Sequence, residues 1–347
     1  MKSVVSFLKE CRLGKKQVFR NLTVFPVLFP GNVDPYYLTL EQAIDSGVLV
    51  VTEVDASGNV NRLKIRNNGK QPVLLIEGEE LKGAKQNRII NASFLIAGKT
   101  ETAIPVSCVE ERRWRYDSKK FSSGKKVMHA SLRREAQFSV CESLAEGAGH
   151  RSDQGKIWNN IAEKSQRMKV KSPTMAMSDV FECYETKLSD YNERFHLIEQ
   201  QVGALFAIDG TVTGLECFAS NDTFAGFFDK LIDSYAMDAI ESADEDKKVP
   251  SVAPGKAKSF IESLQKANGE RHPVVSVGAT ISFESRIAQG AALADGQTVL
   301  HLSAFRKENG SGGSRVGFQR FSARRSRQSR SQHSGSPYDP DYPIIIE

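Results

Sequence analysis

The sequence of 347 residues has no apolar run long enough to cross a bilayer. A membrane-spanning helix needs about 18 consecutive apolar residues, and every apolar stretch here is shorter than that. The first such stretch, "SVVSFL", ends at Lys9 and Glu10, which makes it too short and too charged for a secretory signal peptide. We therefore expect a protein that is not membrane-inserted and that resides in the cytoplasm.

Cysteine is also scarce. The five cysteines are odd in number and widely spaced, and no C-x-x-C pattern occurs among Cys11, Cys108, Cys141, Cys183 and Cys217. This spacing argues against a disulfide framework or a zinc knuckle and favours reduced, buried thiols. Patterns typical of P-loop enzymes, H-E-x-x-H metalloproteases and Ser-His-Asp hydrolases are absent as well.

Charge is distributed unevenly along the chain. Residues 311–347 contain six arginines and three acidic residues, so they carry +3 of the net +5 and leave the remainder nearly neutral. The same tail has almost no aliphatic residues before its last few positions, which predicts disorder. Its basic segment 315–330 is a candidate contact to nucleic acid, with a solvated tail as the alternative.

Short β-branched runs dominate the first third of the chain. Segments 48–54, 60–67, 72–78, 91–98 and 102–110 are separated by Asn, Gly, Asp and Lys, which is typical of antiparallel strands joined by turns. Thr39 and Gln42 form a capping-box pair, which predicts a short helix that begins after Thr39 and precedes these strands. We expect a small antiparallel sandwich or barrel here.

The rest of the chain mixes helices and strands. Apolar residues at steps of three and four predict helices over 128–147, 155–168, 177–201, 220–242 and 255–268, with Ser178 as the cap of the third. Asp209-Gly210 predicts a hairpin between two strands, and two later strands are predicted within 274–283 and 297–305.

The predicted fold class is α+β, with an N-terminal antiparallel β-sandwich or barrel, then helices and a mixed α/β C-terminal half. The predicted segments are an N-terminal extension (1–17), a β-rich half (18–116), a helical segment (117–200), a mixed half (201–307) and a disordered Arg/Ser-rich tail (308–347).

A strongly polar stretch lies between two apolar runs in "LLIEGEELKGAKQNRII", residues 74–90. Gly78 and Gly83 permit tight backbone turns and close approach of a ligand. The intervening carboxylates, amides and cations can hold a phosphate, an amide-bearing base or a hydrated Mg²⁺. The alternative is a solvated, salt-bridged hairpin loop.

A second polar cluster follows the strand in "IPVSCVEERRWRY". Arg112 and Arg113 offer planar, bidentate recognition of phosphate or carboxylate, and Trp114 can stack on a base or accept a cation on its face. The alternative is a tryptophan that closes the end of a barrel, with arginine stems packed on it. Cys108 is interpreted as a core residue because no histidine is near it in sequence.

These two segments, together with "GALFAIDGTVTGLECFASNDTFAGFFDKLIDSYAMDAI", resemble the ARG-and-rhodanese-phosphatase-superfamily-associated domain family over roughly residues 18–306. The matching positions are Glu77, Gly78, Glu79, Lys85, Gln86, Arg88, Cys108, Glu110, Arg113 and Trp114. The resemblance implies genomic neighbours of two kinds, ADP-ribosylglycohydrolases and rhodanese-type phosphatases, and so a role near NAD-derived or ADP-ribosylated molecules. It implies no reaction, so no catalytic role is carried over.

With the resemblance in hand, we predict that the two clusters meet at one end of the β-rich half. Glu77, Glu79 and Glu110 are the candidate catalytic carboxylates, with Glu79 as a general base that activates water. The candidate ligand-binding residues are Lys85, Gln86, Asn87, Arg88, Arg112, Arg113 and Trp114. The expected ligand is a nucleotide or an ADP-ribose-like molecule, either hydrolysed or only bound, with Mg²⁺ as an open option for a cofactor.

Overall fold

A computed structural model describes residues 1–55, 57–244 and 252–308. Residues 1–307 form one compact unit that contains eight helices and eighteen strands among its described residues. The predicted α+β class, with antiparallel sheets in the N-terminal part, is confirmed. The predicted disordered tail and its basic segment 315–330 lie outside the described residues.

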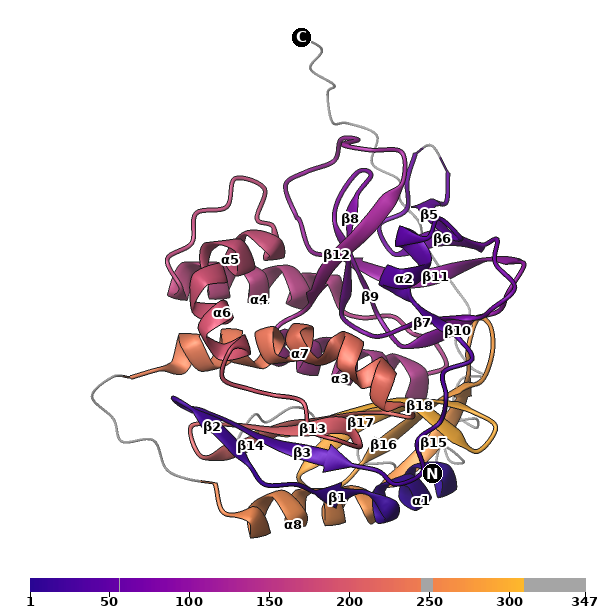
Figure 1. Ribbon diagram of the computed structural model, residues 1–347. Helices are drawn as coiled ribbons and strands as arrows, with labels where there is room; N and C mark the ends of the chain where they lie inside the picture. The colour runs from indigo at the N-terminus through magenta and orange to yellow at the C-terminus, as the bar shows by residue number, and fades with distance from the viewer. Residues whose placement is uncertain (56, 245–251, 309–347) are drawn as a thin grey trace, which may run out of the picture. The chain divides into compact units, whose positions relative to one another are not determined.

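The largest sheet has nine strands and is built from both ends of the chain (Figure 1). β3 crosses from the N-terminal part to pair with β13, so that Val24 lies opposite Phe206. The strand order is β1-β3-β13-β14-β18-β17-β16-β15, with β2 paired to β3. The strands are β1 (Arg12–Leu13), β2 (Gln17–Phe19), β3 (Leu22–Leu28), β13 (Gln201–Ile208), β14 (Thr211–Phe218), β15 (Asn268–Pro273), β16 (Ala279–Glu284), β17 (Ala288–Asp295) and β18 (Thr298–Arg306).

Two smaller sheets form the upper part of the molecule in Figure 1. A six-stranded sheet has the order β12-β8-β9-β11-β6-β5, and a three-stranded sheet has the order β10-β7-β4. Their strands are β4 (Leu38–Thr39), β5 (Leu49–Glu53), β6 (Arg62–Asn67), β7 (Val73–Leu75), β8 (Glu79–Gly83), β9 (Arg88–Ile90), β10 (Phe94–Ile96), β11 (Thr100–Cys108) and β12 (Phe121–Val127). The two sheets share one apolar cluster that includes Leu63, Val73 and Phe94.

The helices separate and cover the sheets (Figure 1). They are α1 (Lys2–Glu10), α2 (Leu40–Asp45), α3 (Ala130–Ala145), α4 (Gln154–Arg167), α5 (Met177–Cys183), α6 (Glu185–Asn192), α7 (Asn221–Ser242) and α8 (Pro254–Gln265). Successive strand residues point to opposite faces of a sheet. Phe206 on β13 accordingly packs in the cluster that contains α7, whereas Leu205 packs in the cluster that contains α1 and α8.

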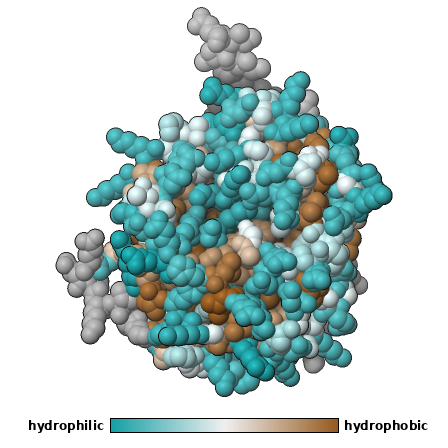
Figure 2. Space-filling model, in the orientation of Figure 1, coloured by the Kyte–Doolittle hydropathy of each residue, from teal (hydrophilic) through white to brown (hydrophobic). Residues whose placement is uncertain are grey.

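Among the described residues, no helix has both the length and the apolar character that crossing a membrane requires. The face in Figure 2 is covered mostly by hydrophilic side chains, with apolar residues gathered in its lower half. All five cysteines are unpaired. Cys108, Cys141 and Cys217 are buried as expected, whereas Cys11 is half-buried and Cys183 is exposed.

Each of the five N-terminal segments predicted as strands overlaps one, namely β5, β6, β7, β10 and β11. The capping box of Thr39 and Gln42 is confirmed at the start of α2. The polar stretch is itself a hairpin, because β8 and β9 pair across residues 84–87. It therefore lies inside the six-stranded sheet and is not a loop between two core strands.

The single helix predicted over 177–201 is wrong. It divides at Tyr184, whose backbone leaves helical geometry (φ −109°, ψ 14°) while its hydroxyl donates to the Met168 carbonyl oxygen at 2.9 Å. Ser178 is not the cap, because α5 begins one residue earlier, after Ala176. The apolar residues at helical spacing in this segment were expected to form one buried face. Phe181 is buried, but Ile198 is 37% exposed.

The predicted hairpin between β13 and β14 is confirmed. Asp209 and Gly210 both have positive φ (50° and 75°), the geometry of a two-residue turn that matches the twist of the flanking strands. Aspartate is among the non-glycine residues that tolerate positive φ best, and the Asp209 carboxylate also accepts hydrogen bonds from Asn21 and Ser242.

Two glycine substitutions are expected to have opposite effects on stability. Gly210→Ala forces a Cβ into positive φ and should lower the free energy of unfolding by about 1 kcal/mol. Gly226→Ala lies on the exposed face of α7 with open space around its Cβ, so it should raise that free energy by about 1 kcal/mol. Urea denaturation of both variants checks this, and two changes of the same sign would contradict it.

Candidate ligand-binding site

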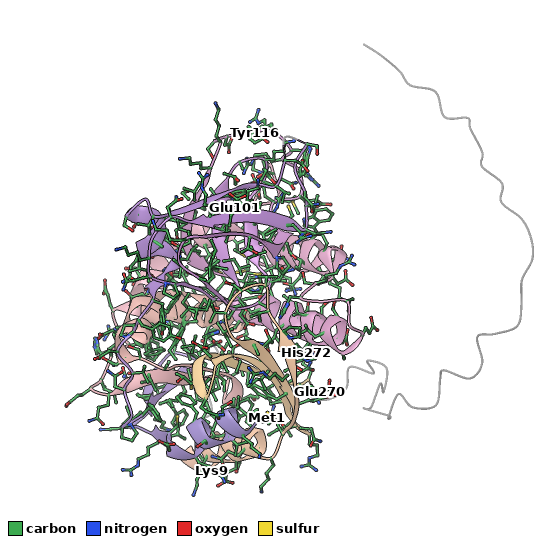
Figure 3. All side chains as sticks on the ribbon, turned by 90° about the vertical axis from the view of Figure 1, so that its right-hand side faces the viewer. Met1, Lys9, Glu101, Tyr116, Glu270 and His272 are labelled. Carbon is green, nitrogen blue, oxygen red and sulfur yellow. The ribbon has the colours of Figure 1, made fainter. Side chains whose placement is uncertain are left out.

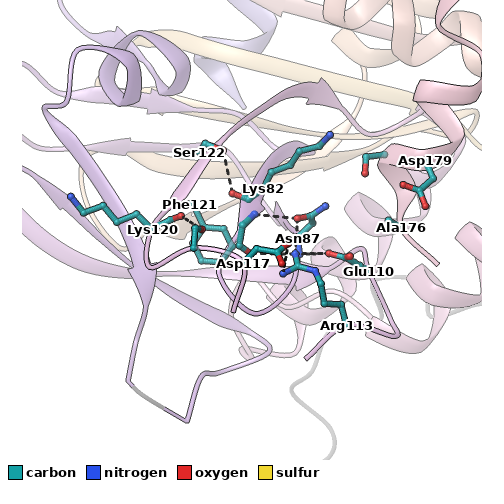
Figure 4. A pocket seen from close by; sticks show the side chains of 13 residues that line it. Lys82, Asn87, Glu110, Arg113, Asp117, Lys120, Phe121, Ser122, Ala176 and Asp179 are labelled. Atoms are coloured by element: carbon teal, nitrogen blue, oxygen red, sulfur yellow. Dashed lines mark hydrogen bonds and ion pairs between the residues drawn. The ribbon is translucent and has the colours of Figure 1, made fainter. Parts of the chain in front are cut away.

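A pocket of about 600 Å³ lies between the six-stranded sheet and α5 (Figure 4). In the view of Figure 4, Lys120 lies at one end of it and Asp179 at the other. The backbone joins its two sides, because Met177 donates to the Val109 carbonyl oxygen at 2.9 Å. The lining residues are Lys82, Gly83, Asn87, Glu110, Arg113, Asp117, Ser118, Lys120, Phe121, Ser122, Ala176, Ser178 and Asp179.

The wall of this pocket is built on one buried guanidinium. Arg113 Nη2 lies 2.6 Å from Glu110 Oε2 and 3.0 Å from Asn87 Oδ1, and Nη1 lies 3.1 Å from Asp117 Oδ2. The Asn87 backbone N–H donates to the same Glu110 oxygen at 3.1 Å. Burial by itself would raise the pKa of Glu110, but Arg113 and the Asn87 amide outweigh it and hold the pKa below its usual value.

Three of the predicted site residues, Asn87, Glu110 and Arg113, therefore come together in the pocket. Lys82 and Lys120 add two cations that are less enclosed than Arg113. Lys82 is paired with the exposed Glu182 at 3.0 Å, and Lys120 has no carboxylate partner among the residues that the structure describes. Figure 4 shows the Lys120 side chain leading away from the other lining residues, so Lys82 is the lysine that lies among them.

Other predicted residues lie on the opposite side of the same hairpin and loop. Side chains alternate along β9, so Arg88 points away from the side to which Asn87 points. Arg88 is fully buried, and Trp114, 47% exposed, lies over its guanidinium with the ring centroid 5.8 Å from Cζ. Lys85 lies over the same ring at 5.1 Å.

Gln86 links the two sides, while Arg112 belongs to neither. The Gln86 amide nitrogen donates to the Glu110 carbonyl oxygen at 2.9 Å, and its oxygen accepts from Arg88 Nη1 at 3.1 Å. Arg112 is exposed, and its backbone N–H donates to the Thr174 carbonyl oxygen at 3.0 Å.

Glu77 lies in a separate, buried ionic network. Its carboxylate accepts from Gln137 at 2.9 Å and 3.0 Å and from Ser303 at 2.5 Å. Arg133 Nη2 lies 3.4 Å from it, while Arg133 Nη1 lies 2.8 Å from Glu216. Glu77 precedes β8, Arg133 and Gln137 are on α3, and Glu216 and Ser303 are on the nine-stranded sheet, so this network joins three layers.

Gly78 makes room for that network. Its φ is +81°, and a Cβ there would lie 3.1 Å from Cγ, Cδ and Nε of Arg133. The close approach that the sequence indicated at Gly78 is thus made by a side chain of the protein itself.

The network holds a second chain of polar contacts. His301 Nδ1 lies 2.8 Å from Ser93 Oγ, and its Nε2 lies 3.6 Å from Glu216 Oε2. Burial opposes the ionised forms, but opposite charges within the network prevail: the pKa of Glu216 is lowered by Arg133, and the pKa of Arg133 is raised by Glu216 and Glu77.

Glu79 and Glu80 are buried on β8 and do not line the pocket. Glu79 Oε2 accepts from the Ile76 backbone N–H at 2.9 Å, and burial raises the pKa of Glu79 to about 7. Both oxygens of Glu80 lack a hydrogen-bond partner among the described residues. Burial raises the pKa of Glu80 to about 8, against the influence of Lys82.

Stability should fall as pH rises because of these two carboxyls. The folded protein keeps the Glu80 proton up to about pH 8, whereas the unfolded chain releases it near its usual value of 4.5. Glu80→Gln should therefore raise Tm by about 4 °C at pH 9 and leave it unchanged at pH 4, as differential scanning fluorimetry can show. The exposed Glu111→Gln is the control, and an equal effect of E80Q at both pH values would refute the assignment.

Arg133→Met should be strongly destabilising, by about 3–5 kcal/mol, because it leaves Glu77 and Glu216 buried without their counter-ion. The triple variant E77Q/R133M/E216Q removes the charges together and should regain more than half of that loss. Arg167→Met, which breaks an exposed pair with Glu241, should cost less than about 1 kcal/mol. Equal losses in the single and triple variants, measured by urea denaturation at pH 7, would contradict the role of the network.

The pocket and the network also contain residues that the sequence did not single out. Arg133, Glu216, Asp179 and Lys120 come from segments that the sequence analysis interpreted only as helix, strand or connection.

No group of three or more His, Cys, Asp or Glu side chains in the described part of the chain is placed to hold a metal ion. The carboxylates named for Mg²⁺ are separated, since Glu110 lines the pocket whereas Glu77 and Glu79 do not.

Comparison with known families gives one match. The model of the ARG and Rhodanese-Phosphatase-superfamily-associated Protein domain matches residues 10–305, so the chain belongs to this family. No curated protein and no solved structure matches significantly. The matched range takes in the pocket, the Arg88–Trp114 side of the hairpin and the buried network.

Proposed function

We propose that this member of the ARG and rhodanese-phosphatase-superfamily-associated family binds a small phosphorylated ligand, of the nucleotide or ADP-ribose class, in the pocket beside Arg113. The observation that carries the proposal is the pocket itself. Its volume of about 600 Å³ lies within the range of small-molecule sites, and its lining mixes three cations and three carboxylates with hydroxyls and an amide.

Lys82, and Lys120 once its flexible side chain turns toward the pocket, are the groups proposed to contact phosphate. A lysine ammonium is a compact point charge that meets phosphate oxygens without a fixed geometry. The hydroxyls of Ser122 and Ser178 supply further donors near these lysines. Arg113 contributes differently, because its ion pairs hold Glu110, Asn87 and Asp117 in place and so fix the shape of the wall.

The carboxylates of the pocket favour binding over hydrolysis. A general base needs a lone pair within reach of a water and a pKa near the working pH. Glu110 and Asp117 are committed to Arg113, and Asp179 accepts from Ser172 at 2.5 Å. Glu79, the base expected from the sequence, is held by the Ile76 backbone outside the pocket lining. Ligand turnover is therefore the less favoured alternative.

The ligand class is supported by association. The family description links this domain to the ARG and rhodanese-phosphatase superfamilies, whose chemistry concerns ADP-ribose and phosphate groups. Such a link narrows the choice of ligands to test, but it does not assign a residue to any of them.

Isothermal titration calorimetry with ADP-ribose, ADP and AMP tests the proposal. We expect saturable binding, weakened about 5–20-fold in Lys82→Ala and in Lys120→Ala, since each loses one charge-assisted contact. The matched control is Lys64→Ala on β6, whose lysine pairs with Glu101 away from the pocket. Chromatography of the recovered ligand should show it intact. Absence of binding by all three compounds would reject the proposal, and conversion of the ligand would replace it with the hydrolase.

A further inference from the structure

Arg88 has an edge without a partner. The side chain is fully buried, and Nη1 donates to the Gln86 amide oxygen at 3.1 Å. Nε and Nη2 have no hydrogen-bond partner among the described residues. Buried donors are almost always paired in folded proteins, so two unpaired ones on a single guanidinium need an explanation.

The unpaired atoms form the edge that arginine uses for bidentate recognition. The N–H bonds of Nε and Nη2 lie in the guanidinium plane and point in the same direction, so they can donate two parallel hydrogen bonds to a carboxylate or phosphate. The nearest acid is Glu53, whose Oε1 lies 3.9 Å from Nη2, beyond hydrogen-bond range. Glu53 Oε2 likewise has no partner in the described chain. The pair is loose, and its donors stay unfilled.

Aromatic and cationic side chains lie beside the Arg88 guanidinium. The half-exposed Trp114 ring lies over the guanidinium, and Lys85 lies 5.1 Å from the centroids of both Trp114 and Tyr116. Lys85 Nζ also donates to the Ser57 carbonyl oxygen at 2.6 Å. Figure 3 shows Tyr116 at the end of the molecule opposite Lys9, at the surface.

We propose that Arg88, Lys85 and Trp114 form a second anion site that takes a carboxylate or phosphate group, on the face of the β8–β9 hairpin opposite the pocket. The anion enters where the Trp114 ring moves aside, and it receives two hydrogen bonds from Nε and Nη2 of Arg88. Lys85 adds a second positive charge at the entrance. Glu53 competes for the same edge, so it limits the affinity.

The charge of the surroundings fits an anion. Burial and the nearby Arg113 lower the pKa of Arg88, and Cys108, Glu53 and Glu110 only partly offset this. A bound anion would replace the favourable interactions with water that the charged Arg88 guanidinium loses on burial. This site goes beyond the proposed function, because it shares no contacting residue with the pocket.

The test uses the fluorescence of Trp114 in the full-length protein with Trp158→Phe, which leaves Trp114 as the single tryptophan. Titration with sodium phosphate, and separately with sodium acetate, at an ionic strength held constant with NaCl should give a saturable change for at least one anion. Arg88→Lys keeps the charge but loses the two parallel donors, so it should weaken the response at least about tenfold. Lys64→Gln is the surface-charge control.

Glu53→Gln is a second variant whose expected effect on anion affinity is opposite to that of R88K. It tests the proposal even if R88K does not fold. Removal of the competing carboxylate should tighten anion binding by about three- to tenfold. A response unchanged in both R88K and E53Q, or no response to either anion, would overturn the proposal. Loss of the response in Lys82→Ala would place the anion in the pocket and overturn it as well.

Discussion

The contact between Arg133 and the carboxylates of Glu77 and Glu216 is the constraint on which the architecture depends. One guanidinium, 1% exposed, joins an acid next to β8, the helix α3 and an acid on β14. A buried charge is tolerated only when its partners are all in place, because low dielectric makes an unpaired ion very costly. The network therefore fixes the N-terminal sheets on the nine-stranded sheet more specifically than apolar packing can. Specificity of this kind is our hypothesis for why the ions are kept.

That contact fixes the position of the hairpin formed by β8 and β9. Gly78 lies against Arg133 at its start, and the hairpin then runs outward to residues 84–87. Because side chains alternate, Asn87 reaches the pocket and Arg88 reaches the space under Trp114. The loop after β11 repeats the division, since Arg113 lines the pocket whereas Trp114 covers Arg88. Two neighbouring segments thus present two different chemical surfaces.

Local features of this fold could be predicted from the sequence, and distant pairings could not. The turn at Asp209-Gly210 and the cap of Thr39 depend on residues a few positions apart. The pairing of β3 with β13 joins residues almost two hundred positions apart, which no periodicity reveals. The candidate site shows the same difference between local and distant contacts. Asn87, Glu110 and Arg113 lie together because β9 and β11, which are close in sequence, are neighbouring strands. Glu77 was grouped with them by sequence, but its partners Arg133, Gln137 and Ser303 come from other layers.

Gln86 gives the two faces of the hairpin a physical connection. Its amide nitrogen is held by the Glu110 carbonyl oxygen on the pocket side, and its oxygen is held by Arg88 on the other. An amide can satisfy both contacts only in one orientation, because its donor and acceptor ends are distinct. A shift of Arg88 toward an anion would lengthen one of these bonds and release Gln86 from its fixed orientation. The Glu110 backbone, which carries the ion pair with Arg113, lies one hydrogen bond further on. The Gln86 side chain is thus one hydrogen-bonded link between the two faces.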